Sequence, residues 1–455
     1  MTSLRSVADR LISKTTPASD AVAMYHALLT QPQDIAPTVV RDFLDTQLTL
    51  ARQLADDANV LPEDIGEWAA WLEGSASQVA CAYREYLQRR HGGSGREFFS
   101  SKAHALYFLQ HVAPTKLVDG AWLYDAVNHA GDWRYHNLIR TYLEELGDGD
   151  PALNHVVLYR KLLAVHDCAA TEVLDQEYYV QGAIQLALGH AGSEYLPEVL
   201  GYNLGYEQLP LHLLITAFEL NELGIDPYYF TLHVTIDNAS TGHAHKAVQA
   251  VFDLLPTDGS RADFIARLRA GYLLNELGKG TKAVIASFDL EQEVVAMLER
   301  KRVFGQHMHS DYCRLDGLTI NEWLSAPGRC RDFLAALENK GWIKRHQDPA
   351  NSRFWQLIEG AGAVMFGVFS GYEKQLLRAW IMGDWQEETR LKKKNPFRAQ
   401  FRRRASKVEP LPTDTSRHPV EHLAGLLSPS KHSTPEGLSA TRAFSRQHSE
   451  GCSIQ

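Results

Sequence analysis

The densest group of residues able to bind a metal lies between Glu144 and His245. His233 and Asp237 are four residues apart in a helix predicted to begin after Pro227, so both side chains project from one helical face. Other predicted helices before this pair also carry carboxylates and histidines. Such inward-facing sets suit two iron ions, because iron accepts hard carboxylate oxygens and imidazole nitrogens. The residues concerned are Glu144, Glu145, His155, Glu207, His233, Asp237 and His243.

Spacing alone leaves an ordinary explanation open, because a buried His or Glu is more often a hydrogen-bonded core residue than a metal ligand. Among twenty histidines, about one His-x-x-x-Asp match is expected by chance. A second match, His307 with Asp311, does occur. With His309 and Cys313 it forms an alternating set that could hold one iron or zinc ion, although its neighbourhood is typical of a polar surface loop.

Another segment favours a different class of protein. A predicted helix over 333–337, Gly341, and two predicted strands around a turn at 348–352 look like the recognition helix and hairpin of a winged-helix DNA-binding protein. The surrounding body is acidic, which disfavours nucleic-acid binding. DNA binding is therefore an alternative function, and a nucleic-acid partner is not expected.

Composition excludes several other classes. The 455 residues are 45% hydrophobic and 22% charged, as in an average protein with two or three packed units. The longest apolar stretch, Gln208–Phe218, is about half of what a membrane span needs. The first residues lack the apolar segment of a secretory signal, so we expect a cytoplasmic protein without a membrane partner.

The cysteines exclude most thiolate chemistry. They are scattered, and no two of them form a Cys-x-x-Cys pair, which argues against zinc-thiolate and iron–sulfur sites. Any metal must therefore use histidines and carboxylates. The five positions are Cys81, Cys168, Cys313, Cys330 and Cys452.

The chain is predicted to be all-α, with four parts: an N-terminal helical segment (1–95), a central domain (96–285), a helical extension (286–385) and a tail (386–455). Helices are expected from Asp263, from Asp289 and from about Phe366. The tail carries 13 Lys and Arg against 7 Asp and Glu, a net charge of +6. Because the whole chain has a net charge of −9, residues 1–385 have a net charge of −15. We expect a disordered basic tail, which could touch anionic surfaces but is more simply a solvated extension.

Three segments together resemble the haem-oxygenase-like di-iron oxygenases, also called iron-containing redox enzymes. Residues 144–147 followed by 154–155 are similar to the family's first ligand element, residues 206–210 to its second, and residues 229–243 to its third. The resemblance covers about residues 100–280 and implies a haem-oxygenase-like helical bundle with helical N- and C-terminal extensions.

The resemblance also implies a site and a reaction. Two iron ions, with O2 as co-substrate, would be bound by Glu144, His155, Glu207, His233, Asp237 and His243. Glu198 is a candidate extra ligand, and His245 could replace His243. Family members N-oxygenate amines, or desaturate or cleave amino acids and fatty acids, usually in specialised metabolism.

We therefore expect a monooxygenase that oxidises a small amine or amino-acid-like substrate, with N-oxygenation favoured. Carbon–carbon cleavage or desaturation of an amino acid or fatty acid is the alternative. The expected partners are a small-molecule substrate, free or bound to a carrier protein, and a reductase or chemical reductant. The sequence is compatible with a homodimer.

Two places depart from the family pattern. His243 follows Asp237 by six residues, so on one unbroken helix the two side chains would point about 120° apart. We expect a bulge or looped turn there, which Gly242 would permit. Gly147, Gly149 and Pro151 likewise predict a break between the first two ligand positions.

Overall fold

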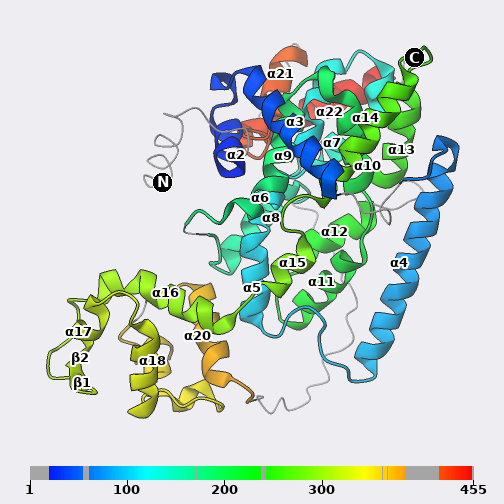
Figure 1. Cartoon of the computed structure of the whole chain (residues 1–455). Helices are drawn as coiled ribbons and strands as arrows, with labels where there is room; N and C mark the ends of the chain where they lie inside the picture. The colour runs from blue at the N-terminus through cyan, green and yellow to red at the C-terminus, as the bar shows by residue number, and fades with distance from the viewer. Residues whose placement is uncertain are drawn as a thin grey trace.

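The computed structural model describes residues 20–54, 61–170, 172–236, 242–360, 362–365, 367–385 and 420–452. Nearly all regular structure in these ranges is helical (Figure 1). Their β-structure is limited to one antiparallel pair, β1 (Arg314–Leu315) and β2 (Leu318–Thr319), in which Leu315 lies opposite Leu318. The predicted all-α class is confirmed. No helix of the described ranges is long and apolar enough to span a membrane.

The central bundle surrounds the apolar core, where Trp122, Tyr142, Tyr159 and Tyr202 are among the largest fully buried side chains. Its helices are α5 (Lys102–His111), α6 (Ala113–Lys116), α7 (His136–Glu145), α8 (His155–Val165), α9 (Val180–His190), α10 (Leu196–Tyr206), α11 (Leu211–Glu222), α12 (Tyr228–Ile236), α13 (His243–Leu254), α14 (Arg261–Leu273) and α15 (Thr281–Ala286). The break predicted between Glu144 and His155 is present, because α7 ends at Glu145 and α8 begins at His155.

Helices α10 and α14 pack so closely that their contact accepts only glycine. A Cβ atom at Gly201 would lie 1.8 Å from the carbonyl oxygen of Leu268, and one at Gly271 would lie 2.2 Å from that of Glu198. Neither backbone can move without separating the helices. The contact therefore fixes the path of α10, which leads directly into Glu207.

In the described residues before the bundle, the helices are α2 (Ala21–Thr30), α3 (Pro37–Leu54) and the long α4 (Trp68–His91), which runs along one side of the molecule (Figure 1). The glycine-rich stretch 92–95 separates α4 from α5, as its composition predicts. Beyond it, the buried carboxylate of Glu219 on α11 accepts hydrogen bonds from the backbone N–H groups of Glu97, Phe98 and Phe99, at 2.5, 3.0 and 2.9 Å. It also accepts one from the Tyr86 hydroxyl of α4 at 2.9 Å, so one side chain ties this joint to the bundle.

We predict that Glu219→Ala lowers the free energy of unfolding by about 3 kcal/mol or more, because the buried N–H groups of Phe98 and Phe99 and the partly buried N–H of Glu97 lose this acceptor. The measurement is the urea unfolding midpoint. Glu222→Ala, one turn further along α11, is the matched control, since it removes only a partly exposed ion pair with Arg90 and should cost about 1 kcal/mol or less. Equal losses in both variants would contradict this role of Glu219.

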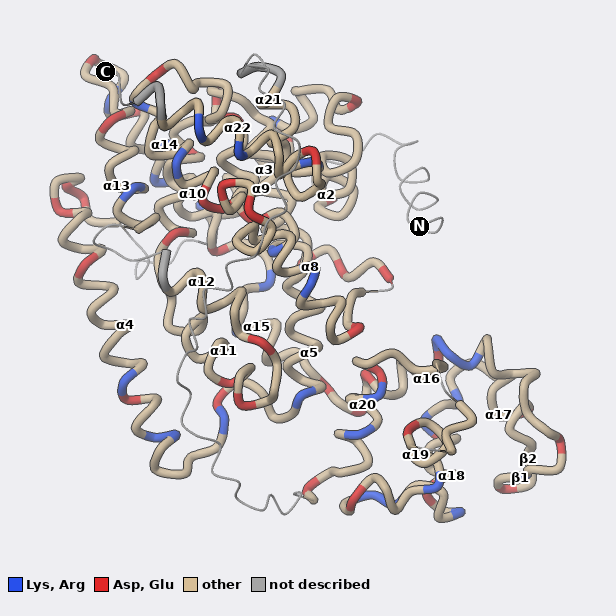
Figure 2. The backbone as a smooth tube through the Cα atoms, turned by 180° about the vertical axis from the view of Figure 1, so that it is seen from behind, with Lys and Arg blue, Asp and Glu red and all other residues tan. Residues whose placement is uncertain are grey.

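Residues 290–382 form a smaller lobe beside the bundle in both views (Figures 1 and 2). Its helices are α16 (Leu290–Gly305), α17 (Ile320–Ser325), α18 (Cys330–Asn339), α19 (Arg353–Ile358) and α20 (Gly371–Met382). The predicted N-cap at Asp289 is present, since its side chain accepts from the N–H of Gln292 at 2.9 Å. The helix expected from about Phe366 begins only at Gly371, where Ser370 forms a capping box with Glu373.

The hairpin expected after the 333–337 helix is not formed. The first segment, 342–345, has no strand structure, and the second belongs to helix α19. The two segments still meet through a hydrogen bond from Phe354 N–H to the Trp342 carbonyl (2.9 Å). Lys and Arg are interspersed with Asp and Glu along the described backbone (Figure 2), so the structural basis of the winged-helix interpretation is missing.

The prediction of a disordered tail is wrong for its last part. Residues 386–419 lie outside the described ranges, but α21 (Val420–Leu426) and α22 (Pro435–Cys452) are helical. Leu427, His432 and Phe444 are buried against the bundle. The excess of basic and small polar residues in the tail as a whole hid these few anchoring side chains.

Candidate metal centre

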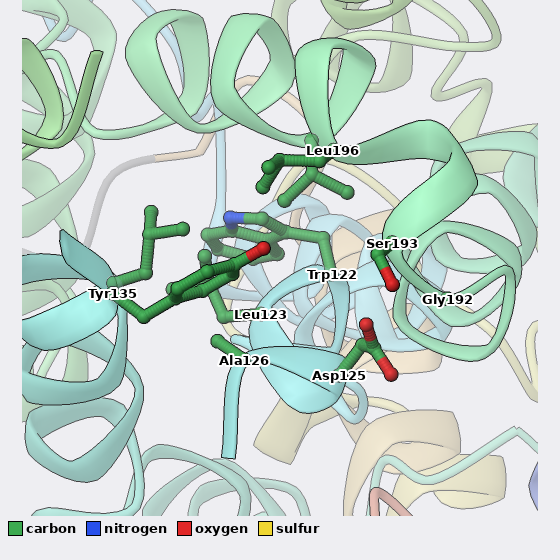
Figure 3. Close-up of a pocket in the computed structure, with 10 residues that line it drawn as sticks. Trp122, Leu123, Asp125, Ala126, Tyr135, Gly192, Ser193 and Leu196 are labelled. Carbon is green, nitrogen blue, oxygen red and sulfur yellow. The ribbon is translucent and has the colours of Figure 1, made fainter. Parts of the chain in front are cut away.

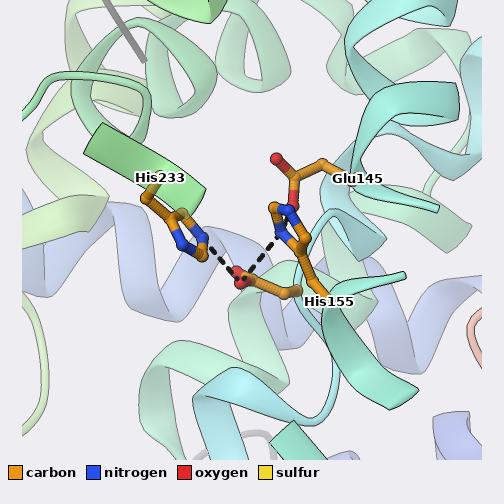
Figure 4. A group of neighbouring side chains, drawn as sticks. Glu145, His155 and His233 are labelled. Carbon is orange, nitrogen blue, oxygen red and sulfur yellow. Dashed lines mark hydrogen bonds and ion pairs between the residues drawn. The ribbon is translucent and has the colours of Figure 1, made fainter. Parts of the chain in front are cut away.

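Four buried side chains converge inside the bundle. Asp119 follows α6, Glu145 ends α7, His155 begins α8 and His233 lies on α12. One ligand atom of each lies within 4.8 Å of one ligand atom of the others. The His155 and His233 imidazoles approach the Asp119 carboxylate at 3.7 and 3.3 Å (Figure 4), and His155 Nδ1 also forms an ion pair with Glu145.

A second group of three overlaps the first. Glu145, Glu207 and His243 meet the same 4.8 Å limit, and all three are buried. His243 Nδ1 lies 3.3 Å from a Glu145 oxygen and 3.1 Å from a Glu207 oxygen. Glu145 therefore belongs to both groups and stands between them.

Local helix geometry explains why Glu145, rather than Glu144, points into the core. On α7, Glu145 follows the buried residues Leu138 and Tyr142 at helical spacing, while Glu144 is rotated by about 100°. Glu144 instead contacts Arg140 (3.0 Å), Lys246 (2.5 Å) and the Nε2 atom of His243 (2.7 Å). Glu144 thus lies behind the His243 imidazole, on the side away from Glu145 and Glu207.

Partners on the outer side orient these histidines. His233 Nδ1 lies 2.8 Å from the Tyr229 carbonyl oxygen, which can only accept, so Nδ1 donates to it and Nε2 is the ring nitrogen that faces Asp119, at 3.3 Å. Glu144 plays the corresponding part behind His243. Asp119 is itself fixed by the hydroxyl groups of Tyr206 (2.9 Å) and Tyr229 (2.5 Å). This is the outer shell that metal-binding imidazoles and carboxylates require.

The pKa shifts record how strongly the charges interact. Burial alone would raise the pKa of Asp119, but Lys116, His155 and His233 hold it well below its usual value. Burial also opposes the lowering of the Glu145 pKa to about 2, which comes mainly from His155. For His155, burial is outweighed by Glu145 and Asp119, which raise its pKa to about 10. The carboxylates are therefore charged at neutral pH and need positive charge close by.

The two overlapping ligand groups together have the chemistry of a cation site. Three carboxylates share one buried volume, and burying such charges is costly unless a positive ion or partner neutralises them. The buried Nε2 atom of His155 has no hydrogen-bond partner among the described residues. A metal coordinated by carboxylate oxygens and imidazole nitrogens would satisfy both requirements.

Of the other predicted ligands, Glu198 and His245 join neither group. Glu198 is buried but forms a bidentate ion pair with Arg267 at 2.7 Å to both nitrogens, and it joins neither group. His245 is half-buried, two residues beyond His243 on α13. Asp237 lies outside the described residues. The helix is interrupted before His243, as expected, because α12 ends at Ile236 and α13 begins at His243.

Asp119 was missed by sequence reasoning. It lies between α6 and a 3-10 segment, where no helical periodicity marks the side that faces inward. One signal was available, because Asp119 is an isolated acid between the apolar pairs Leu117–Val118 and Ala121–Trp122. Such an acid is buried only with a partner.

The alternative metal site predicted at residues 307–313 is not formed by the described residues. His307 and Asp311 are exposed, and Asn321 contacts the His309 carbonyl oxygen and the Asp311 carboxylate. Among the described residues, the groups that could hold a metal do not include His307, His309, Asp311 or Cys313.

A small surface pocket contains none of these candidate ligands (Figure 3). Its lining includes Trp122, Asp125, Tyr135 and Ser193. The Trp122 ring separates it from Tyr206, at 4.5 Å between ring centroids. The pocket is therefore not an opening onto the metal ligands.

The comparison with protein families agrees with this geometry. Residues 106–276 match the model of a family described as iron-containing redox enzyme, and this range holds all residues of both ligand groups. Neither a curated protein nor a solved structure shows significant similarity to the chain. This match confirms the predicted resemblance to the haem-oxygenase-like family for residues 106–276, and it supports an oxidoreductase.

The two overlapping groups predict distinct metal-binding defects. Glu145→Gln should weaken both metal sites, since Glu145 is shared, whereas His233→Ala should weaken one. Glu144→Gln should keep both sites and lower affinity about 10- to 100-fold, as expected of a residue that orients a ligand. Titration with Mn(II), followed by the electron paramagnetic resonance signal of free Mn(II), measures the equivalents bound. Full binding by Glu145→Gln together with loss in Glu144→Gln would reverse the two assignments.

Proposed function

We propose that this protein is a non-haem di-iron oxygenase. The observation that carries the proposal is that one buried carboxylate, Glu145, belongs to two adjacent ligand groups. A carboxylate with two oxygens can bridge two cations, which is how helical bundles hold iron pairs. The first group would hold one iron through Asp119, His155 and His233, and the second would hold the other through Glu207 and His243.

When bound, the two irons would supply electrons to reduce dioxygen. The chain's own part is to fix the ligands and to exclude water. The Tyr229 carbonyl and Glu144 hold the two imidazoles in one orientation, while Tyr206 and Tyr229 hold Asp119. The ring of Tyr159 packs on that of Tyr229, with centroids 4.7 Å apart, so the outer side of this first group is apolar.

For the reaction, we favour N-oxygenation of a small amine or amino-acid-like substrate, because it needs only a nucleophilic nitrogen beside the activated oxygen. Oxidative cleavage or desaturation of an amino acid or fatty acid by the same centre is the second candidate. Both proposals rest on the family assignment. The proposed setting is the cytoplasm, with a reductase or chemical reductant and a substrate that is free or bound to a carrier protein.

Iron loading tests the proposal directly. We predict that anaerobic protein binds close to two equivalents of Fe(II), because there are two ligand groups, and gives a transient visible absorption when mixed with oxygen. Glu207→Ala and His233→Ala should each reduce the iron content and abolish the transient. The control is His245→Ala, which removes a neighbouring histidine outside both groups. Wild-type behaviour in Glu207→Ala and His233→Ala would refute the di-iron assignment.

The substrate class is tested by oxygen uptake. With iron-loaded protein and a reductant, we expect amines or amino acids to accelerate uptake and to gain one oxygen atom on nitrogen, detected by mass spectrometry. Fatty acids assayed at the same concentration are the comparison. Acceleration by fatty acids alone would remove the amine hypothesis and favour cleavage or desaturation.

A further inference from the structure

The connection between α7 and α8 is held from outside the family-matched region. Glu145 and His155 flank it, so its conformation sets the distance between these two candidate ligands. The Asn154 side chain accepts from the N–H of Val157 (3.0 Å) and donates to the carbonyl of Leu146 (3.1 Å). Its amide nitrogen also lies 3.1 Å from Nδ1 of His432, in the segment between α21 and α22. One amide thus joins the end of α7, the start of α8 and the C-terminal segment.

Other contacts of the C-terminal segment surround the same connection. The Tyr142 hydroxyl of α7 donates to the Leu427 carbonyl at 2.5 Å. Arg442 Nε of α22 donates to the Gly149 carbonyl at 2.9 Å, and the Ser445 hydroxyl donates to Asp148 at 2.7 Å.

The packing at this point is tight. Gly149 has φ +82°, and a Cβ atom there would lie 2.3 Å from the Leu438 carbonyl oxygen. The connection contains three glycine or aspartate residues with positive φ, a conformation that few side chains stabilise. Its geometry therefore depends on the surface against which it packs, and α22 provides that surface.

His432 is suited to accept a hydrogen bond. It is buried, and burial, together with the charges of Arg160 and His155, lowers its pKa to about 3. The imidazole is thus neutral at pH 7. Because Asn154 uses its amide oxygen for Val157, its amide nitrogen must donate to His432, which fixes Nδ1 of His432 as the acceptor.

We propose that the C-terminal segment 423–445 is a clamp on the metal centre, in which His432 is a positioning residue acting through Asn154 on Glu145 and His155. This inference rests on the proposed function, because it assumes that those two residues bind metal. If the clamp fixes their separation, the metal site is weakened when the clamp is released. By thermodynamic reciprocity, a bound metal must hold the clamp in place by the same factor.

The experiment uses the full chain and Mn(II) as the probe. We expect His432→Leu to lower the affinity for Mn(II) about 10- to 100-fold, because the Asn154 amide loses its acceptor. His432→Asn should restore much of the affinity, since its amide oxygen can take the place of Nδ1. The matched control is His448→Leu on α22, whose imidazole contacts His136 (3.1 Å) instead of the connection. It should bind Mn(II) like the wild type.

A second readout follows the clamp itself. Hydrogen exchange measured by mass spectrometry should slow in residues 435–452 of the wild type when Mn(II) is added, and this effect should shrink in His432→Leu. Should that variant fail to fold, Arg442→Ala removes a different clamp contact, with the exposed Arg446→Ala as its control.

The outcomes separate the two proposals. If the wild type binds no Mn(II), the metal centre and the clamp are both refuted. If the wild type binds Mn(II) but His432→Leu binds it equally well, the clamp is refuted and the metal centre stands. The same holds if Mn(II) does not change the rate of hydrogen exchange in α22. If His448→Leu lowers the affinity for Mn(II) as much as His432→Leu does, the loss reflects general destabilisation of the protein, and the clamp is also refuted.

Discussion

The structure depends on burying three acidic side chains together inside an apolar bundle. Asp119, Glu145 and Glu207 are all buried, and burial of like charges is tolerated only when positive charge and hydrogen bonds surround them. In this chain, His155 and Lys116 provide part of that positive charge, and tyrosine hydroxyls provide hydrogen bonds to Asp119. A pair of metal ions would provide the rest. The helices around the centre can be understood as supports for this arrangement.

Those supports come from well beyond the ligand groups. The glycine contact between α10 and α14 sets the path of the helix that leads into Glu207. The Glu219 carboxylate accepts hydrogen bonds from the backbone of Phe98 and Phe99, which leads into α5. The C-terminal segment packs on the connection between α7 and α8. The family-matched region therefore contains both candidate ligand groups, while flanking segments that the match does not cover pack against it.

Local patterns predicted what depends on short-range rules. Helical spacing located α14, spacing together with the N-cap at Asp289 located α16, and the glycines and proline after Glu145 located the break before His155. The spacing could not choose between Glu144 and Glu145, because adjacent helical residues differ by about 100° and the choice depends on which face the bundle covers. Asp119 and the docking of α22 depend on contacts between segments far apart in the chain. Such contacts leave little trace in local composition, and the tail's basic and polar residues outweighed Leu427 and Phe444.

The contact between Asn154 and His432 has a consequence for synthesis of the protein. A growing chain contains every residue of the two ligand groups once residue 243 has emerged, but the segment that packs on their connection is made almost two hundred residues later. Chains are synthesised at about 5–20 residues per second, and N-terminal parts fold first. For roughly 10 to 40 seconds the nascent protein therefore contains both candidate ligand groups without the segment that packs on their connection. Final closure of this region therefore waits until the segment around His432 has been made.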